Sequence, residues 1–92
     1  MINAIRRTPS FKRDWKKLNA KHANARKLEQ AIESIVRNDA KLLRQLHDHA
    51  LTGQWKGYRE LHIEGDWLLI YRIEHDTLTL VLTRTGSHNQ PF

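Results

Sequence analysis

Apolar residues in the first half of the chain recur at the spacing of an α-helix. Phe11, Trp15 and Leu18 lie at positions i, i+4 and i+7, and lysine or arginine occupies most of the positions between them. Ser10 precedes the first of these residues and could accept a hydrogen bond from a backbone N–H at the start of a helix. The pattern predicts an amphipathic helix that starts near Pro9 and turns its basic side to solvent.

A second amphipathic period is clearer and covers residues 28–36. Its apolar positions recur at 0, 3, 4, 7 and 8 and are Leu28, Ala31, Ile32, Ile35 and Val36. Asn38 and Asp39 end this period, and residues 41–46 could add a further helical turn. Because only residues 21–24 separate the two periods, the sequence predicts a helical hairpin.

Beyond Trp55 the pattern changes to the two-residue period of a β-strand. Residues 58–63 alternate, residues 67–73 are aromatic and aliphatic as in a covered strand, and residues 77–84 alternate leucine with threonine. Residues 1–7 could form a further short strand. The order β-α-α-β-β-β predicts an α+β fold in which the helical hairpin packs on a twisted antiparallel sheet.

Arg84 conflicts with the alternation of the last predicted strand. Counting by twos from Leu78 places Arg84 on the same face as Leu80 and Leu82, which is the face of the core. We expect either a β-bulge near Thr83, which would reset the alternation, or a strand that ends before the arginine.

Length and composition narrow the class of protein. The 92 residues predict a single domain, 1–92, with one small core. The chain has no cysteine, which excludes a disulfide scaffold, a thiolate metal site and a cysteine nucleophile. The longest apolar run, residues 67–71, is far shorter than the ~20 residues that span a bilayer, and no secretory h-region follows the N-terminus. We therefore expect a cytoplasmic protein without a membrane partner.

Positive charge is concentrated in the first half of the chain. Residues 1–44 hold twelve of the sixteen lysines and arginines and four of the ten acidic residues, whereas residues 45–92 hold five of the six histidines. A polyanion is one predicted partner, because Lys and Arg bind phosphates and release counterions. The alternative is a solvated basic face that keeps a small protein soluble.

Side chains capable of acid–base chemistry fall near one edge of the predicted sheet. The first and third strands of a meander end at the same edge, which could bring together His62, Asp66, Arg84 and His88, while His49 precedes the sheet. Histidine can act as base or acid near neutral pH, and arginine suits phosphate oxygens. These groups could cleave RNA through attack of a ribose 2′-OH on the adjacent phosphorus, without a metal or an organic cofactor.

Three motifs in the second half together resemble the YafQ branch of the RelE superfamily. They are D-H-x-L-x-G-x-W-x-G-x-R from Asp48, D-W-x-L-I-Y from Asp66 and R-T-G-[ST]-H from Arg84. The superfamily comprises toxins of type II toxin–antitoxin systems. The resemblance implies a RelE-like fold, metal-independent mRNA cleavage that is commonly on the ribosome, and a cognate antitoxin. Operator DNA would be reached only through the antitoxin complex.

The resemblance also implies roles for individual residues. Its catalytic set comprises His49, His62, Asp66, Arg84 and His88. Arg84 would stabilise the phosphate and His88 would act as general acid, while the division of duties among the other three stays open. Trp67 and Phe92 match positions where an aromatic ring supports the site or the substrate base. The basic helix residues that could contact ribosomal RNA are Lys12, Arg13, Lys16 and Lys17.

Each of these residues also has a structural interpretation. Arg84 could form a salt bridge at a strand end, Asp66 could serve only the turn, and Trp67 could belong to the core. We expect His47 and His75 to be exposed and uninvolved. Two other functions compete with the nuclease: a non-cleaving RelE-fold module that acts through antitoxin and operator DNA, and a ParE-like toxin that acts on gyrase.

Overall fold

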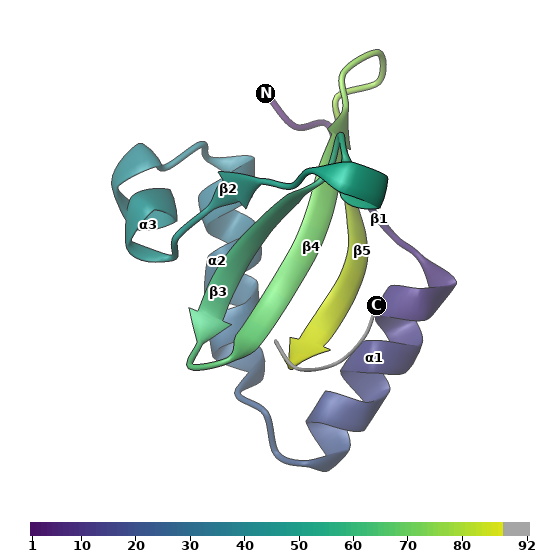
Figure 1. Ribbon diagram of the computed structural model, residues 1–92, viewed down its shortest axis with the longest axis vertical. Coiled ribbons are helices and arrows are strands. Elements are labelled where there is room, and N and C mark those ends of the chain that lie inside the picture. Colours follow the sequence, from purple (N-terminus) through teal and green to yellow (C-terminus); the bar gives the residue numbers. More distant parts are fainter. Residues whose placement is uncertain (88–92) are drawn as a thin grey trace.

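The computed structural model describes residues 1–87, and within them three helices pack on a five-stranded sheet (Figure 1). The helices are α1 (Pro9–Ala20), α2 (Ala25–Val36) and α3 (Ala40–Gln45), and a 3₁₀ turn, η1, covers Gly53–Trp55. The strands are β1 (Ala4–Arg7), β2 (His49–Ala50), β3 (Arg59–Glu64), β4 (Trp67–Glu74) and β5 (Thr79–Ser87). The predicted α+β fold class, with helices on a sheet, is confirmed.

The sheet is mixed, which corrects the prediction of a wholly antiparallel one. Its strand order is β1-β5-β4-β3-β2, and β1 runs parallel to β5 while the other pairs are antiparallel. Two parallel strands need a long crossover connection between them, and here α1 and α2 form the first part of the connection from β1 to β5. The two-residue strand β2, which pairs with β3, was not predicted because it is too short to show a period.

Capping residues determine where the first two helices begin. Thr8, and not the predicted Ser10, caps α1: its Oγ1 accepts from the backbone N–H of Phe11 at 3.0 Å, and Pro9 occupies the first turn. Ser10 lies inside the helix. Asn24 caps α2 by accepting from the N–H groups of two following residues, Arg26 and Lys27. Within residues 1–87 no helix is long and apolar enough to cross a bilayer.

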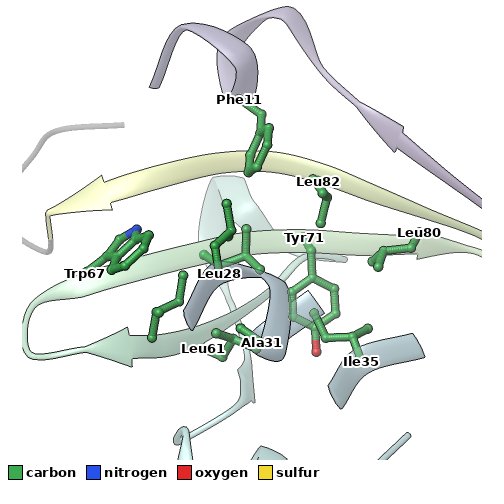
Figure 2. Packing of buried hydrophobic residues seen from close by; sticks show 11 residues of the cluster. Phe11, Leu28, Ala31, Ile35, Leu61, Trp67, Tyr71, Leu80 and Leu82 are labelled. Atoms are coloured by element: carbon green, nitrogen blue, oxygen red, sulfur yellow. The ribbon is translucent and has the colours of Figure 1, made fainter. Parts of the chain in front are cut away.

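The core lies between the helices and one face of the sheet, here called the helix face. Figure 2 shows Phe11 of α1 and Leu28 of α2 directed toward the side chains of the strands. The buried strand residues of this cluster are Leu61, Ile63, Trp67, Leu69, Tyr71, Leu80 and Leu82. Alternation along the strands directs the residues between them to the opposite side, the second face.

A β-bulge resolves the conflict at Arg84. Ile70 pairs with Arg84 and Tyr71 pairs with Leu82, so Thr83 is an extra residue on β5. Leu82 therefore lies on the helix face and Arg84 lies on the second face, although the two are two positions apart. This confirms the first of the two predicted alternatives.

Candidate active site

Polar residues form a row across the second face of the sheet. Strand register pairs His49 with Glu60, Glu60 with Ile70, and Ile70 with Arg84. Residues that stand directly opposite each other on paired strands share a face and lie close together. The row therefore places His49, Glu60 and Arg84 on one face, with a single isoleucine between the carboxylate and the guanidinium.

His62 and Asp66 lie nearer the end of the sheet where β3 turns into β4. His62 is two residues beyond Glu60 on the same face and pairs with Leu68, which in turn pairs with Gly86. Asp66, in the turn, accepts a hydrogen bond from the Ser87 hydroxyl at 2.9 Å. The C-terminal ends of β3 and β5 thus lie at the same end of the sheet, as expected for a meander.

Three histidine rings cluster at the β3 end of this face. The rings of His47 and His49 lie 5.8 Å and 6.4 Å from the ring of His62. The backbone N–H of His62 donates to the carbonyl of Leu46 at 2.7 Å, which fixes β3 against the end of α3. His47 is exposed as predicted, and its ring lies beside that of His62.

The two ring nitrogens of His49 both face acceptors. Nδ1 lies 2.8 Å from the His47 carbonyl oxygen and Nε2 lies 3.0 Å from Oε2 of Glu60, whose side chain is only 13% exposed. A carbonyl and an ionised carboxylate can only accept hydrogen bonds. The geometry therefore holds the His49 ring by both nitrogens, between the backbone of His47 and the side chain of Glu60.

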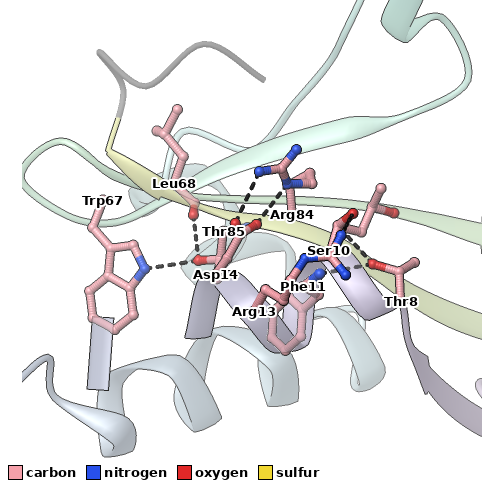
Figure 3. A network of polar contacts seen from close by, with 10 residues as sticks. Thr8, Ser10, Phe11, Arg13, Asp14, Trp67, Leu68, Arg84 and Thr85 are labelled. Carbon is pink, nitrogen blue, oxygen red and sulfur yellow. Dashed lines mark hydrogen bonds and ion pairs between the residues drawn. The ribbon is translucent and has the colours of Figure 1, made fainter. Parts of the chain in front are cut away.

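Arg84 is held by a buried carboxylate of α1 (Figure 3). Its Nε and Nη2 donate to the two oxygens of Asp14 at 2.7 Å and 3.0 Å, and the arginine side chain is 26% exposed. The hydrogen bond with Asp14 raises the pKa of Arg84 above its ordinary value. The structural interpretation of Arg84, a salt bridge at the strand end, is thus present, and the guanidinium also belongs to the row on the second face.

Trp67 is a core residue, which is the structural interpretation that the sequence left open beside a supporting role at the site. Its side chain lies on the helix face, the residue is 7% exposed, and its ring stacks on Trp15 with centroids 6.1 Å apart. The indole Nε1 donates to the hydroxyl of Thr85 at 2.9 Å. The stacking on Trp15 and the hydrogen bond to Thr85 therefore hold the ring in the core.

The four basic residues predicted to bind RNA are all exposed on α1. A step of about 100° per residue places Arg13 and Lys17 on the side of the helix nearest Asp14, and Lys12 and Lys16 on the opposite side. Figure 3 draws Arg13 on α1, where its Nη2 donates to the hydroxyl of Ser10 at 3.2 Å. The first pair of basic residues thus flanks the candidate site, and the second pair does not.

Some sequence-based predictions concern the end of the chain or the opposite end of the sheet. His88 and Phe92 lie outside the described residues. His75 is exposed in the turn between β4 and β5, far from the edge that carries Asp66. Within residues 1–87, no group of three or more His, Cys, Asp or Glu side chains is arranged to hold a metal ion.

Two residues of the site were not predicted from the sequence. Glu60 is two residues from His62 in the predicted strand, so alternation places both on the same face, but Glu60 belongs to none of the three motifs. Asp14 lies at i+3 from Phe11 and is the one acidic residue within the helix 9–20. Its position on the buried side of a basic helix was the available signal.

A polar network on the helix face supports the strands that carry the site. Asp48 accepts from Nε and Nη2 of Arg59 at 3.1 Å and 2.8 Å and from the hydroxyl of Tyr71. The hydrogen bond with Asp48 raises the pKa of Arg59. Burial, followed by the hydrogen bond to Asp48, raises the pKa of Tyr71 above its ordinary value. Asp48 directly precedes His49, so this network anchors the strand that presents the His49 ring.

The stability of the protein is expected to fall above about pH 10, and to fall less steeply in Tyr71→Phe. The folded state keeps the tyrosine proton to a higher pH than the unfolded chain does. The contribution of Tyr71 is therefore fully present below the unfolded pKa and is lost as pH rises above it, with a slope of up to about 1.4 kcal/mol per pH unit. Urea unfolding of both proteins from neutral to alkaline pH measures the difference, and parallel pH profiles would contradict the prediction.

The sequence can now be compared with known proteins. Residues 3–92 match the family described as a bacterial toxin of type II toxin–antitoxin system, YafQ. The chain belongs to the YafQ family. The mRNA interferase toxin YafQ of Escherichia coli (strain K12) is 35% identical over 82 residues, which cover 89% of this chain and 87% of that protein. The resemblance inferred from the motifs is confirmed.

Solved structures of YafQ-like toxins have the same fold. The crystal structure of the E. coli DinJ–YafQ complex matches with a TM-score of 0.81 and 34% identity, over 96% of this chain and 94% of that one. A copper-bound mutant toxin from Helicobacter pylori matches with a TM-score of 0.85 and 36% identity over the whole of both chains. The arrangement of helices and sheet described above is therefore that of the YafQ family.

Proposed function

We propose that this protein is an mRNA endoribonuclease toxin of a type II toxin–antitoxin system, and that it inhibits translation. The observation that carries the proposal is the presence of two histidines, a carboxylate and an arginine on one face of the sheet, in two adjacent rows. Family membership supports the same activity, because the E. coli relative is an mRNA interferase. The reaction class is internal transesterification at a phosphodiester.

The proposed step needs a base, an acid and a cation. A base, His62 or Asp66, removes the proton of the ribose 2′-OH, and the oxygen attacks the adjacent phosphorus. The bond from phosphorus to the 5′ oxygen breaks, and a general acid, His88, gives a proton to the departing oxygen. Arg84 stabilises the negative charge on the phosphorane. The products are a 2′,3′-cyclic phosphate and a 5′-hydroxyl, and neither a metal nor an organic cofactor takes part.

His49 and Glu60 form a pair on the same face of the sheet. Both ring nitrogens of His49 already face acceptors, so the ring is held in place by the His47 carbonyl and by Glu60. Because both nitrogens are engaged in this way, we favour His62 or Asp66 as the base and give His49, held by Glu60, a supporting role.

The basic residues of α1 and membership of the YafQ family support two proposed partners, RNA and an antitoxin. Arg13 and Lys17, on the side of α1 nearest Arg84, would contact the phosphates of mRNA or ribosomal RNA. A cognate antitoxin would bind and silence the toxin, as supported by the complex of the E. coli relative with DinJ. Operator DNA would be contacted only through that complex, and the site of action would be the cytoplasm, where mRNA is translated.

Primer extension on mRNA after induction of the toxin tests the function. Wild-type protein is expected to create new 5′ ends and to arrest growth, and His62→Ala is expected to slow cleavage by about 10²–10⁴-fold, the range for loss of a general acid or base. His75→Ala is the matched control, because this histidine is exposed at the opposite end of the sheet. Intact mRNA accompanied by DNA damage would instead support a gyrase toxin, and intact mRNA with operator binding would support a non-cleaving module.

A further inference from the structure

A buried acidic residue on the basic helix has no part in the proposed chemistry. Asp14 is 5% exposed, although the basic residues around it on α1 face solvent. A buried carboxylate is tolerated only when charged or polar donors satisfy it. The donors that surround Asp14 come from β5, about 70 residues later in the sequence, so its position links the first helix to the last strand.

Asp14 satisfies two groups of β5 at once. Its Oδ2 accepts from Nε of Arg84 at 2.7 Å and from the backbone N–H of Thr85 at 3.1 Å, and its Oδ1 accepts from Nη2 of Arg84 at 3.0 Å. The pairing of β1 with β5 ends at Leu82, so Thr85 lies on a stretch of the β5 edge where β1 provides no partner. The Asp14 carboxylate therefore accepts the Thr85 N–H in place of a neighbouring strand, and it also binds the guanidinium of Arg84.

The Thr85 side chain connects this group of hydrogen bonds to the neighbouring strand β4. Its hydroxyl donates to the carbonyl of Leu68 at 2.7 Å and accepts from the indole of Trp67, so the residue next to Arg84 is held from both sides (Figure 3). Thr85 is 1% exposed. The backbone that carries the arginine is therefore rigid, and the direction of its guanidinium is set by Asp14.

We propose that Asp14 is a positioning residue that aims Arg84 at the scissile phosphate. A guanidinium is planar and has five N–H groups in fixed directions, so holding Nε and one N–H of Nη2 also fixes the direction of the other three. The two held groups point to α1, and the arginine itself arises from the second face, beside Ile70 and Glu60. This role rests on the proposed nuclease function and adds a residue to it.

A competing role for Asp14 predicts the opposite result. If the carboxylate only occupied a surface of Arg84 that a phosphate needs, its neutralisation would strengthen RNA binding and speed cleavage. A positioning role predicts slower cleavage without weaker binding, because a misdirected guanidinium still attracts the phosphate but stabilises the transition state poorly. The sign of the effect on the rate therefore separates the two roles.

Single-turnover cleavage of mRNA on programmed ribosomes measures both the rate constant of cleavage and the half-saturation concentration, which reports binding. Asp14→Asn keeps the shape of the side chain and an oxygen for the Thr85 N–H but removes the charge. We expect its rate constant at saturation to fall by about 10–100-fold, the size expected for a small displacement of a catalytic group, while its half-saturation concentration does not rise. In an Arg84→Lys background the same change is expected to lower the rate by less than about three-fold, since the guanidinium is already absent.

Several outcomes would overturn the positioning role. The first is a cleavage rate for Asp14→Asn that equals or exceeds the wild-type rate. The second is a fold-loss of rate for Asp14→Asn that is the same in the Arg84→Lys background as in the wild type, because this would indicate a merely structural effect. Circular dichroism checks that each variant is folded. Should Asp14→Asn unfold, Asp14→Glu keeps the charge but moves the carboxylate, and its wild-type rate would likewise overturn the role. Absence of cleavage by the wild type itself would reject the nuclease function, and with it this role.

Discussion

Arg84→Ala is expected to lower the single-turnover rate of mRNA cleavage by about 10²–10³-fold, the effect of removing one preorganised donor from a developing oxyanion. The guanidinium is the permanent cation in the row of polar residues on the second face. Its removal also leaves the buried Asp14 without two of its three donors, so the free energy of unfolding should be measured alongside the rate. Cleavage is followed by primer extension, and toxicity by growth after induction.

Arg72→Ala is a matched control for this substitution. Arg72 lies on β4, two residues beyond Ile70 on the same face, but its guanidinium contacts Glu74 and lies over the ring of Tyr58. We expect its cleavage rate to stay within about three-fold of the wild type. A wild-type rate in a folded Arg84→Ala protein would reject the role of Arg84 in stabilising the phosphate.

Trp67→Ala is expected to destabilise the protein by about 3–5 kcal/mol, the usual cost of removing a large aromatic side chain from a core. The ring fills the space against Trp15 and its N–H satisfies Thr85, so the loss creates a cavity and breaks a buried hydrogen bond. Chemical denaturation monitored by circular dichroism measures the change. For a small domain this is a large share of the total stability, and reduced accumulation in cells is expected to follow.

Trp67→Phe separates the core role of this residue from a role in substrate binding. Phenylalanine keeps most of the apolar packing and loses the hydrogen bond to Thr85, so we expect a destabilisation of about 1–2 kcal/mol and a cleavage rate within about three-fold of the wild type. If the folded Trp67→Phe protein bound or cleaved RNA far more weakly than the wild type, the ring would have a direct part in substrate recognition after all.

Much of the fold could be predicted from hydrophobic periodicity because each element buries one side. The period of residues 28–36 predicted most of α2, and alternation located β3, β4 and β5 to within a few residues. The conflict of parity at Arg84 pointed to a bulge, although alternation alone could not decide between a bulge and a strand end. The capping residue of α1 was placed two positions late, because both Thr8 and Ser10 are suitable caps.

The parts that failed depend on contacts between distant segments. The pairing of β1 with β5 and its parallel direction are not encoded in the local pattern of residues 4–7. The motif left open whether Trp67 supports the site or belongs to the core, because the stacking on Trp15 that holds it in the core joins two segments far apart in the chain. Glu60 and Asp14 were missed for a related reason: each acquires its role only from a partner on another element.

The ion pair between Asp14 and Arg84 has a consequence for the order in which the protein folds during its synthesis. Its two halves are separated by 70 positions, so a growing polypeptide possesses the carboxylate long before it possesses the guanidinium. The contact can form only after the last strand has left the translating ribosome and docked on α1. The strand that carries Arg84 clears the ribosome only once the chain is complete, so this ion pair is among the last contacts of the fold to form.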